Sequence, residues 1–273
     1  MRVLWVFAHP EQRSLSGALR DAGVRWLEDA GHQVMVSDLY AMGWNPIVSG
    51  EDFAHDARER LIVGDASALA YASGRLSADI VEEQRKIAWA DTLVFQFPLW
   101  WYGMPAILKG WFDRIFVKGF AFGVNDPGTG QTLRYGQGNL SGKTAMVVTS
   151  VGARESSIGP RGINGEINEL LFPLQHGTLW YTGISVVPPL VVHGADRAAV
   201  EDYELAVKQL RGRLQELPET PPIRFRCQNG GDYDGRLELR SDIAPGQRGP
   251  QIHVDDSDRI APAARTSGGD VIG

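Results

Sequence analysis

The chain has 273 residues, and its hydrophobic content of 43% is enough for one large buried core with an appendage. Its net charge of −6 argues against nucleic acid as the main partner. The single cysteine, Cys227, excludes an intramolecular disulfide and favours a reducing compartment, so we expect a cytoplasmic protein. We find neither a signal peptide nor an apolar run of membrane-spanning length, so we expect no membrane insertion.

The first residues predict a βαβ unit. A strand over residues 3–7 is followed by a loop with His9, by Ser14 and Ser16 as candidate helix caps, and by a second strand over residues 34–39. The loop lacks the glycine pattern of dinucleotide-binding Rossmann domains. Its serine hydroxyls and the backbone N–H groups of the helix N-terminus suit a phosphate, and the alternative is that both serines are ordinary caps.

The central stretch joins a buried strand to an amphipathic helix. Residues 93–97 are an apolar run typical of a strand buried on both faces, and Pro98 ends it. Residues 100–102 are three consecutive aromatics, and apolar side chains recur at helical spacing over residues 107–116. Because ligands bind at the carboxyl ends of parallel strands, the aromatic turn could cover a planar ligand. The alternative is an apolar core turn with no ligand.

A fourth strand over residues 145–149 brings a further loop to the same edge. The polar loop of residues 150–164 follows that strand at its carboxyl end. We therefore expect this loop on the rim that also holds His9 and Trp101.

Three later segments complete the main domain. A helix that begins near residue 167 contains Pro173, which predicts a kink or break. Residues 184–192 form the last strand region, interrupted by two prolines, and residues 198–217 form an amphipathic helix. The alternation of strands and helices predicts an α/β fold, a doubly wound parallel five-stranded sheet with the flavodoxin-like order 2-1-3-4-5.

Residues 218–273 differ in composition from the rest of the chain. They are rich in Pro, Gly, Asp and Arg and cannot make their own core. We expect a C-terminal extension that lies on the main domain, residues 1–217, or on a partner subunit.

Several strings resemble one known family, the NAD(P)H:quinone oxidoreductases (DT-diaphorase-like flavoproteins). The longest string, FQFPLWWYGMPAILKGWFDRIF at residues 95–116, is highly specific. The shorter strings lie at residues 37–42 with Asn45 and Pro46, residues 76–81 and residues 174–179. The resemblance covers roughly residues 1–217.

The resemblance implies a homodimer with a flavodoxin-like fold and FAD in each site. The residues that it assigns to FAD are His9, Ser14, Leu15, Ser16, Pro98, Leu99, Trp100, Trp101, Thr149, Ser150 and Gly152. Of these, the residues from Ser14 to Ser16 match the turn that holds the pyrophosphate. Pro98 to Trp101 match the turn along the flavin ring. The positions that it assigns to the substrate pocket are Tyr102, Phe122, Val124 and Tyr181.

The sequence departs from the family near the flavin O2. The better-known members have a tyrosine and a histidine there, which stabilise charge, whereas this chain has Asn164 at the histidine position and Ile158 nearest to the tyrosine position. Asparagine can donate a hydrogen bond but cannot take up a proton. Some members with asparagine at this position use another hydride donor, so the donor stays open. Phe122 and Val124 replace two pocket tyrosines, which makes the pocket more apolar.

His176 matches a histidine that one branch of the family uses in a metal site. The second histidine of that site is Trp180 here, and a lone histidine is a poor metal site. We therefore expect a structural role for His176 and no metal.

The resemblance implies FAD-dependent, two-electron reduction of quinones or similar planar acceptors by NAD(P)H, with ping-pong kinetics. Trp101, Gly152 and Asn164 would act at the flavin, whose own chemistry carries the reaction. FMN is a less fitting cofactor. The alternatives are a redox-active regulatory subunit that docks on a membrane transporter and an electron-carrier flavodoxin that binds FMN.

Overall fold

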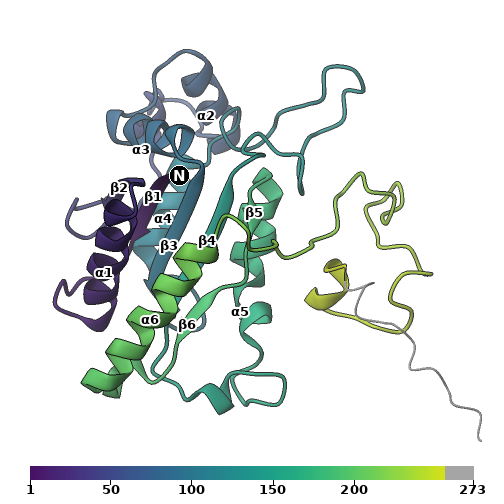
Figure 1. The fold of residues 1–273 in the computed structure, drawn as a ribbon. Helices are drawn as coiled ribbons and strands as arrows, with labels where there is room; N and C mark the ends of the chain where they lie inside the picture. Colours follow the sequence, from purple (N-terminus) through teal and green to yellow (C-terminus); the bar gives the residue numbers. More distant parts are fainter. Residues whose placement is uncertain (256–273) are drawn as a thin grey trace, which may run out of the picture.

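A computed structural model describes residues 1–255, and it shows a parallel sheet with helices on both faces (Figure 1). The strand order is β2-β1-β3-β4-β5, and β6 also pairs with β4, so the predicted α/β fold and order 2-1-3-4-5 are confirmed. The strands are β1 (Arg2–Phe7), β2 (Gln33–Asp38), β3 (Thr92–Pro98), β4 (Thr144–Ser150), β5 (Ser185–Val186) and β6 (Leu190–Val192). The predicted last strand is thus two short strands, with Pro188 and Pro189 between them, because proline cannot donate to the ladder.

Two pairs of helices cover the sheet. Helices α1 and α6 contact each other on one face, and α3 and α4 contact each other on the opposite face (Figure 1). The helices are α1 (Leu15–Asp29), α2 (Val63–Ala72), α3 (Ala78–Trp89), α4 (Ala106–Ile115), α5 (Ile167–Leu174) and α6 (Val200–Glu216). Short 3₁₀ turns lie at η1 (Gly50–Phe53), η2 (Glu155–Ser157), η4 (Trp180–Thr182), η5 (Ala195–Arg197) and η6 (Pro250–His253). None of the helices among residues 1–255 is both long enough and apolar enough to cross a membrane.

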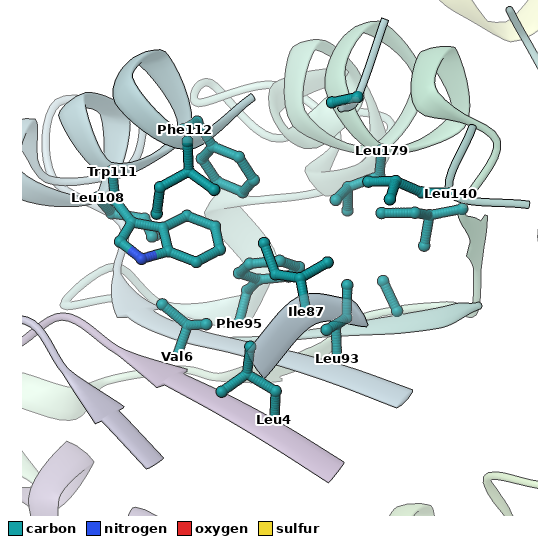
Figure 2. Close-up of a cluster of buried hydrophobic side chains, with 14 of the residues drawn as sticks. Leu4, Val6, Ile87, Leu93, Phe95, Leu108, Trp111, Phe112, Leu140 and Leu179 are labelled. Atoms are coloured by element: carbon teal, nitrogen blue, oxygen red, sulfur yellow. The ribbon is translucent and has the colours of Figure 1, made fainter. Parts of the chain in front are cut away.

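The alternation of side chains along β1 divides the core between the two faces. Leu4 and Val6 pack with Phe95 toward α3 and α4, as Figure 2 shows, whereas Val3 and Trp5 pack toward α1 and α6. Successive residues of a strand point to opposite faces, so a strand buried on both sides must be apolar at every position. This requirement explains the continuous apolar runs that predicted β1 and β3.

Helix α5 changes its geometry where the sequence predicted a break. Pro173 lies in its last turn, and the chain continues directly as a π-helical turn, η3 (Gln175–Leu179). Proline has no N–H to donate and its ring crowds the preceding turn, so regular α-helix cannot run on unchanged.

The described part of the extension packs on the same chain. The N–H of Ile223 donates to the carbonyl of Val186 at 2.7 Å, and the Trp180 Nε1–H donates to the carbonyl of Arg226 at 3.2 Å. Phe225 is buried in the core cluster beside α5. From there the extension winds away beside α5 in Figure 1, and residues 256–273 of the predicted extension lie outside the described residues.

Candidate cofactor-binding site

A cavity of about 520 Å³ lies at the carboxyl ends of β1, β3 and β4. Its lining residues are His9, Ser14, Leu15, Ser16, Pro98, Leu99, Trp100, Trp101, Ser150, Gly152, Ala195 and Asp196. The structure therefore brings together every residue predicted to contact the cofactor except Thr149. The Thr149 side chain is buried, and its hydroxyl donates to the carbonyl of Phe97 at 2.9 Å.

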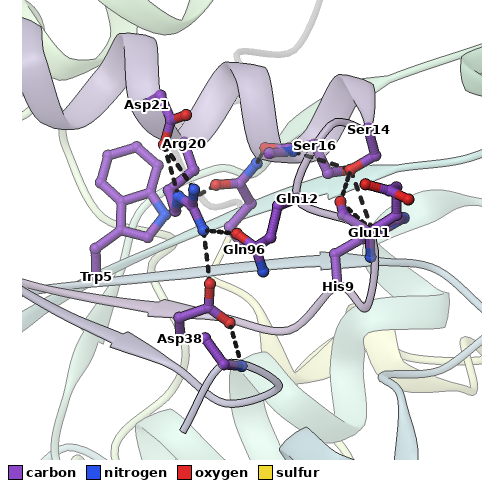
Figure 3. A network of polar contacts seen from close by, with 12 residues as sticks. Trp5, His9, Glu11, Gln12, Ser14, Ser16, Arg20, Asp21, Asp38 and Gln96 are labelled. Atoms are coloured by element: carbon purple, nitrogen blue, oxygen red, sulfur yellow. Dashed lines mark hydrogen bonds and ion pairs between the residues drawn. The ribbon is translucent and has the colours of Figure 1, made fainter.

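One end of the cavity is the N-terminus of α1. The Ser14 hydroxyl donates to the carbonyl of Glu11 at 2.6 Å and accepts from the N–H of Gly17 at 3.1 Å, so Ser14 is the N-cap (Figure 3). Its oxygen also lies 3.1 Å from Nδ1 of His9. The first N–H groups of a helix have no intrahelical acceptor, and the helix dipole is positive at this end, so the site favours a phosphate group.

Ser16 has a different role from Ser14. It is 4% exposed, and its hydroxyl lies 3.1 Å from the hydroxyl of Ser150 across the cavity floor. The interpretation of both serines as ordinary caps therefore holds for Ser14 and is wrong for Ser16.

A buried polar network fixes the start of α1 to the sheet. Gln96 accepts from Trp5 Nε1 at 2.9 Å and donates to the carbonyl of Ser16 at 2.7 Å. On the neighbouring turn, Arg20 forms an ion pair with Asp38 at 2.7 Å (Figure 3). Gln96 was not among the predicted site residues, although a glutamine inside the apolar run of β3 is a signal, because a buried amide needs hydrogen-bond partners.

The other end of the cavity is the aromatic turn after β3. Trp101 and Tyr102 have φ angles of 50° and 61°, a left-handed conformation that is unfavourable for residues with a side chain. Reciprocal hydrogen bonds of 3.0 Å between the backbones of Trp100 and Gly103 close the turn. Trp101 is 97% exposed, and Trp100 and Tyr102 are also exposed. The alternative of an apolar core turn is therefore wrong, and strain combined with exposure is typical of a binding site.

Gly152 lines the cavity beside the carboxylate of Asp196, which was not among the predicted site residues. A Cβ atom at Gly152 would lie 2.0 Å from Oδ2 of Asp196, so no larger residue fits without a shift. Asp196 lies in η5, shortly after β6, and β6 pairs with the end of β4. A polar residue that soon follows a strand of a parallel sheet was the signal available in the sequence.

Asn164 links the aromatic turn to the loop after β4. Its Oδ1 accepts from the Tyr102 hydroxyl at 3.0 Å, and its Nδ2 donates to the Ser157 hydroxyl at 3.2 Å. Asn164 is not among the residues that line the cavity. Ile158, which lies nearest to the family's tyrosine position, is buried.

The four residues predicted for the substrate pocket do not lie together within a single copy of the chain. Tyr102 lies on the aromatic turn, whereas Phe122 lines a separate cavity of about 330 Å³ beside α4. Val124 accepts a backbone hydrogen bond from Leu133 at 2.8 Å, and Tyr181 packs edge-on against Tyr135 with ring centroids 5.1 Å apart.

His176 lies in a half-buried aromatic cluster and is not among the residues that line the cofactor cavity. Its ring stacks on Phe172 and Tyr135, with centroid distances of 4.5 and 4.9 Å. Burial lowers the pKa of His176 to about 4, and its Nε2 has no hydrogen-bond partner. Within residues 1–255, no group of three His, Cys, Asp or Glu side chains is placed to hold a metal ion.

Fold and site together define a class of protein with a flavodoxin-like fold, and a family model with that description matches residues 1–217. A ribosyldihydronicotinamide dehydrogenase-like protein of Penicillium crustosum is 46% identical over 237 residues, which are 85% of this chain and 87% of the relative. NAD(P)H dehydrogenase (quinone) 1 of Cavia porcellus is 38% identical over 226 residues, 82% of this chain and 80% of the relative.

Among solved structures, a Klebsiella pneumoniae protein assigned provisionally as a quinone reductase superposes with a TM-score of 0.88. It is 46% identical, and the match covers 93% of this chain and 99% of that one. The chain belongs to the NAD(P)H:quinone oxidoreductase family within the flavodoxin-like fold, and it is an oxidoreductase.

Proposed function

We propose that the protein reduces quinones or similar planar acceptors by two electrons, with FAD as cofactor, NAD(P)H as donor and ping-pong kinetics. The observation that carries the proposal is one cavity that joins a helix N-terminus to a strained, exposed aromatic turn. The first feature suits phosphates and the second suits a flat ring system. The names of the relatives support the reaction class.

The donor set of the cavity fits a flavin nucleotide. We propose that the N-terminus of α1, with Ser14, Leu15 and Ser16, holds the pyrophosphate beside His9. The flavin ring would lie along the turn from Pro98 to Trp101. Gly152 lines the cavity and has no Cβ, so a ligand could approach its backbone closely.

In this proposal a bound flavin would supply the redox chemistry, the transfer of a hydride and of two electrons, and the residues of the chain would hold and orient it. Backbone N–H groups near Trp101 would hydrogen-bond the N5–O4 side of the ring. Gly152, with Thr149 and Ser150, would lie at the N1–O2 side. Asn164 would act beside them as a neutral hydrogen-bond donor, and its contact with Tyr102 fixes its amide.

The Penicillium crustosum relative carries a name that points to ribosyldihydronicotinamide as the hydride donor. We keep NAD(P)H as the proposed donor and treat ribosyldihydronicotinamide as the competing one. A direct comparison of the two donors at equal concentration separates them.

We propose that the protein is a cytoplasmic homodimer whose main domain spans residues 1–217. The aromatic turn is open in one chain, and Phe122, Val124 and Tyr181 lie outside its cavity. A second copy that supplies these side chains would cover the ring and complete the substrate pocket. Residues 218–273 would then be an extension of the main domain.

An anaerobic visible spectrum tests the proposed function. Purified protein reconstituted with FAD should show an oxidised flavin band that bleaches with one equivalent of NADPH and returns with one equivalent of a simple quinone. Mass spectrometry of the released cofactor distinguishes FAD from FMN. The proposal is wrong if reconstituted protein binds no flavin, or if bound flavin stays oxidised with both NADPH and ribosyldihydronicotinamide.

A further inference from the structure

Asp196 is an acidic group at the Gly152 end of the cofactor cavity. The Oδ2 atom lies 2.0 Å and Cγ lies 2.8 Å from the position that a Cβ at Gly152 would take, so the carboxylate faces the open side of that glycine. The turn is anchored to the loop after β4, because the N–H of Ala195 donates to the carbonyl of Val151 at 3.0 Å. A ligand group placed against Gly152 therefore lies close to a carboxylate whose backbone is anchored to the loop after β4.

The Asp196 carboxylate has no ion-pair partner among residues 1–255, so its charge can act on a ligand. Among the residues that line the cavity, the titratable ones are His9 and Asp196, and Nδ1 of His9 lies 3.1 Å from the Ser14 hydroxyl oxygen. Across residues 1–255, no hydrogen bond or ion pair engages Asp196, and its side chain is exposed. The other charged or titratable groups on the two loops that meet here are His193, Arg197, Arg154 and Glu155. None of these four lines the cavity.

The sequence lacks a side chain that could exchange a proton at the positions where the better-known relatives have one. Asn164 cannot carry a proton charge, and Ile158 is apolar and buried. We infer that Asp196 is the residue that sets the protonation of the reduced flavin at its N1–O2 edge. This inference rests on the proposed function, in which that edge lies against Gly152.

The effect is electrostatic. A negative carboxylate beside the N1–O2 edge disfavours a second negative charge there, so that edge keeps its proton to a higher pH than it would without Asp196. Below that pH, reduction takes up two electrons from the reductant and two protons from solvent, and above it two electrons from the reductant and one proton from solvent. The midpoint potential therefore falls half as steeply with pH above this transition as below it.

The test is the midpoint potential of flavin-loaded protein measured from pH 5 to pH 9. We expect the pH at which the slope halves to lie about one unit lower in Asp196→Asn than in the unaltered protein, since a nearby charge shifts a protonation equilibrium by about that amount. Asp196→Glu keeps the charge and is expected to keep the transition. Asp29→Asn is the matched control, because it removes one exposed carboxylate at the opposite end of α1.

An unchanged transition in Asp196→Asn, with flavin bound in every variant, overturns the inference and leaves the proposed function standing. An equal shift in Asp29→Asn also overturns it, because net charge would then explain the effect. Failure of the unaltered protein to bind flavin overturns the proposed function itself and this inference with it.

Discussion

The two ends of the cofactor cavity are built in opposite ways. At the N-terminus of α1, Ser16 and Gln96 are buried and every polar group of the network has a partner. At the aromatic turn, Trp101 is almost fully exposed and its backbone is held in an unfavourable conformation. The first end is complete within one chain, whereas the second leaves the aromatic side chains of Trp100, Trp101 and Tyr102 exposed. We therefore expect the α1 end to bind its ligand group with little rearrangement, and the aromatic turn to store backbone strain at the binding site.

The largest expected effect comes from closing the cavity between the two ends. Gly152→Ala places a methyl group where the Asp196 carboxylate lies, and because this exposed side chain can turn aside in part, flavin binding should weaken by about 2 kcal/mol, or roughly 30-fold. Titration of flavin into apo-protein measures it. Gly177→Ala is the control, because a Cβ there meets no atom within 4 Å. The double variant Gly152→Ala, Asp196→Ala should recover most of the affinity, and wild-type affinity in the single variant would refute the steric account.

The pre-organised end should respond in stability. Gln96→Leu leaves the indole N–H of buried Trp5 without an acceptor and frees the carbonyl of Ser16, which should lower the free energy of unfolding by about 2 kcal/mol. Urea unfolding measures the loss. Gln215→Leu on the exposed face of α6 should change stability little. Equal stabilities of the two variants would mean that the network does not hold the start of α1.

The half-buried aromatic cluster around His176 sharpens the contrast with the exposed aromatic turn. Burial lowers the pKa of His176 from 6.5 to about 4 in the folded protein, so the unfolded chain takes up this proton first as the pH falls. The histidine therefore costs stability progressively between about pH 6.5 and pH 4. His176→Phe keeps the ring stack, and its stability advantage over the unaltered protein should grow by about 1–2 kcal/mol across that range.

Thermal unfolding at pH 7, 5.5 and 4.5 measures this effect. His55→Phe, which removes a histidine outside the cluster, is the control variant. A constant difference between His176→Phe and the unaltered protein at all three pH values would contradict the burial of a neutral imidazole.

The smallest effect should appear at the strained turn. Trp101→Gly relieves a positive φ at an exposed position, so it should raise the free energy of unfolding of the apo-protein by about 0.5–1 kcal/mol while weakening flavin binding. Leu237→Gly is a matched control, because Leu237 also has a positive φ, of 64°, and is exposed outside the cavity. It should stabilise the protein without changing flavin binding. Weakened flavin binding in both variants would mean that the effect of Trp101→Gly is not specific to the aromatic turn.

The sequence predicted those parts of the fold whose signal is local. The apolar runs of β1 and β3, the cap at Ser14 and the break near Pro173 each follow from a few neighbouring residues. The α/β class and the strand order followed from the alternation of these elements. The resemblance to a family supplied the residue set that the cavity brings together.

The parts that the sequence did not predict depend on long-range contacts. Gln96 and Trp5 are separated by 91 residues and meet only in the folded sheet. Asp196 reaches Gly152 because β6 pairs with β4, and no local pattern specifies that pairing. The exposure of Trp101 could not be inferred from an apolar run of aromatics, which looks the same in a core and at a binding site.

The measurement that tests the central claim most directly is the titration of FAD into apo-protein, followed by tryptophan fluorescence and calorimetry. Because Trp100 and Trp101 line the cavity, we predict saturation at one FAD per chain with strong quenching, part of which disappears in Trp101→Gly. Saturable binding of neither FAD nor FMN, or quenching that Trp101→Gly leaves intact, would contradict the claim that this cavity is the flavin site.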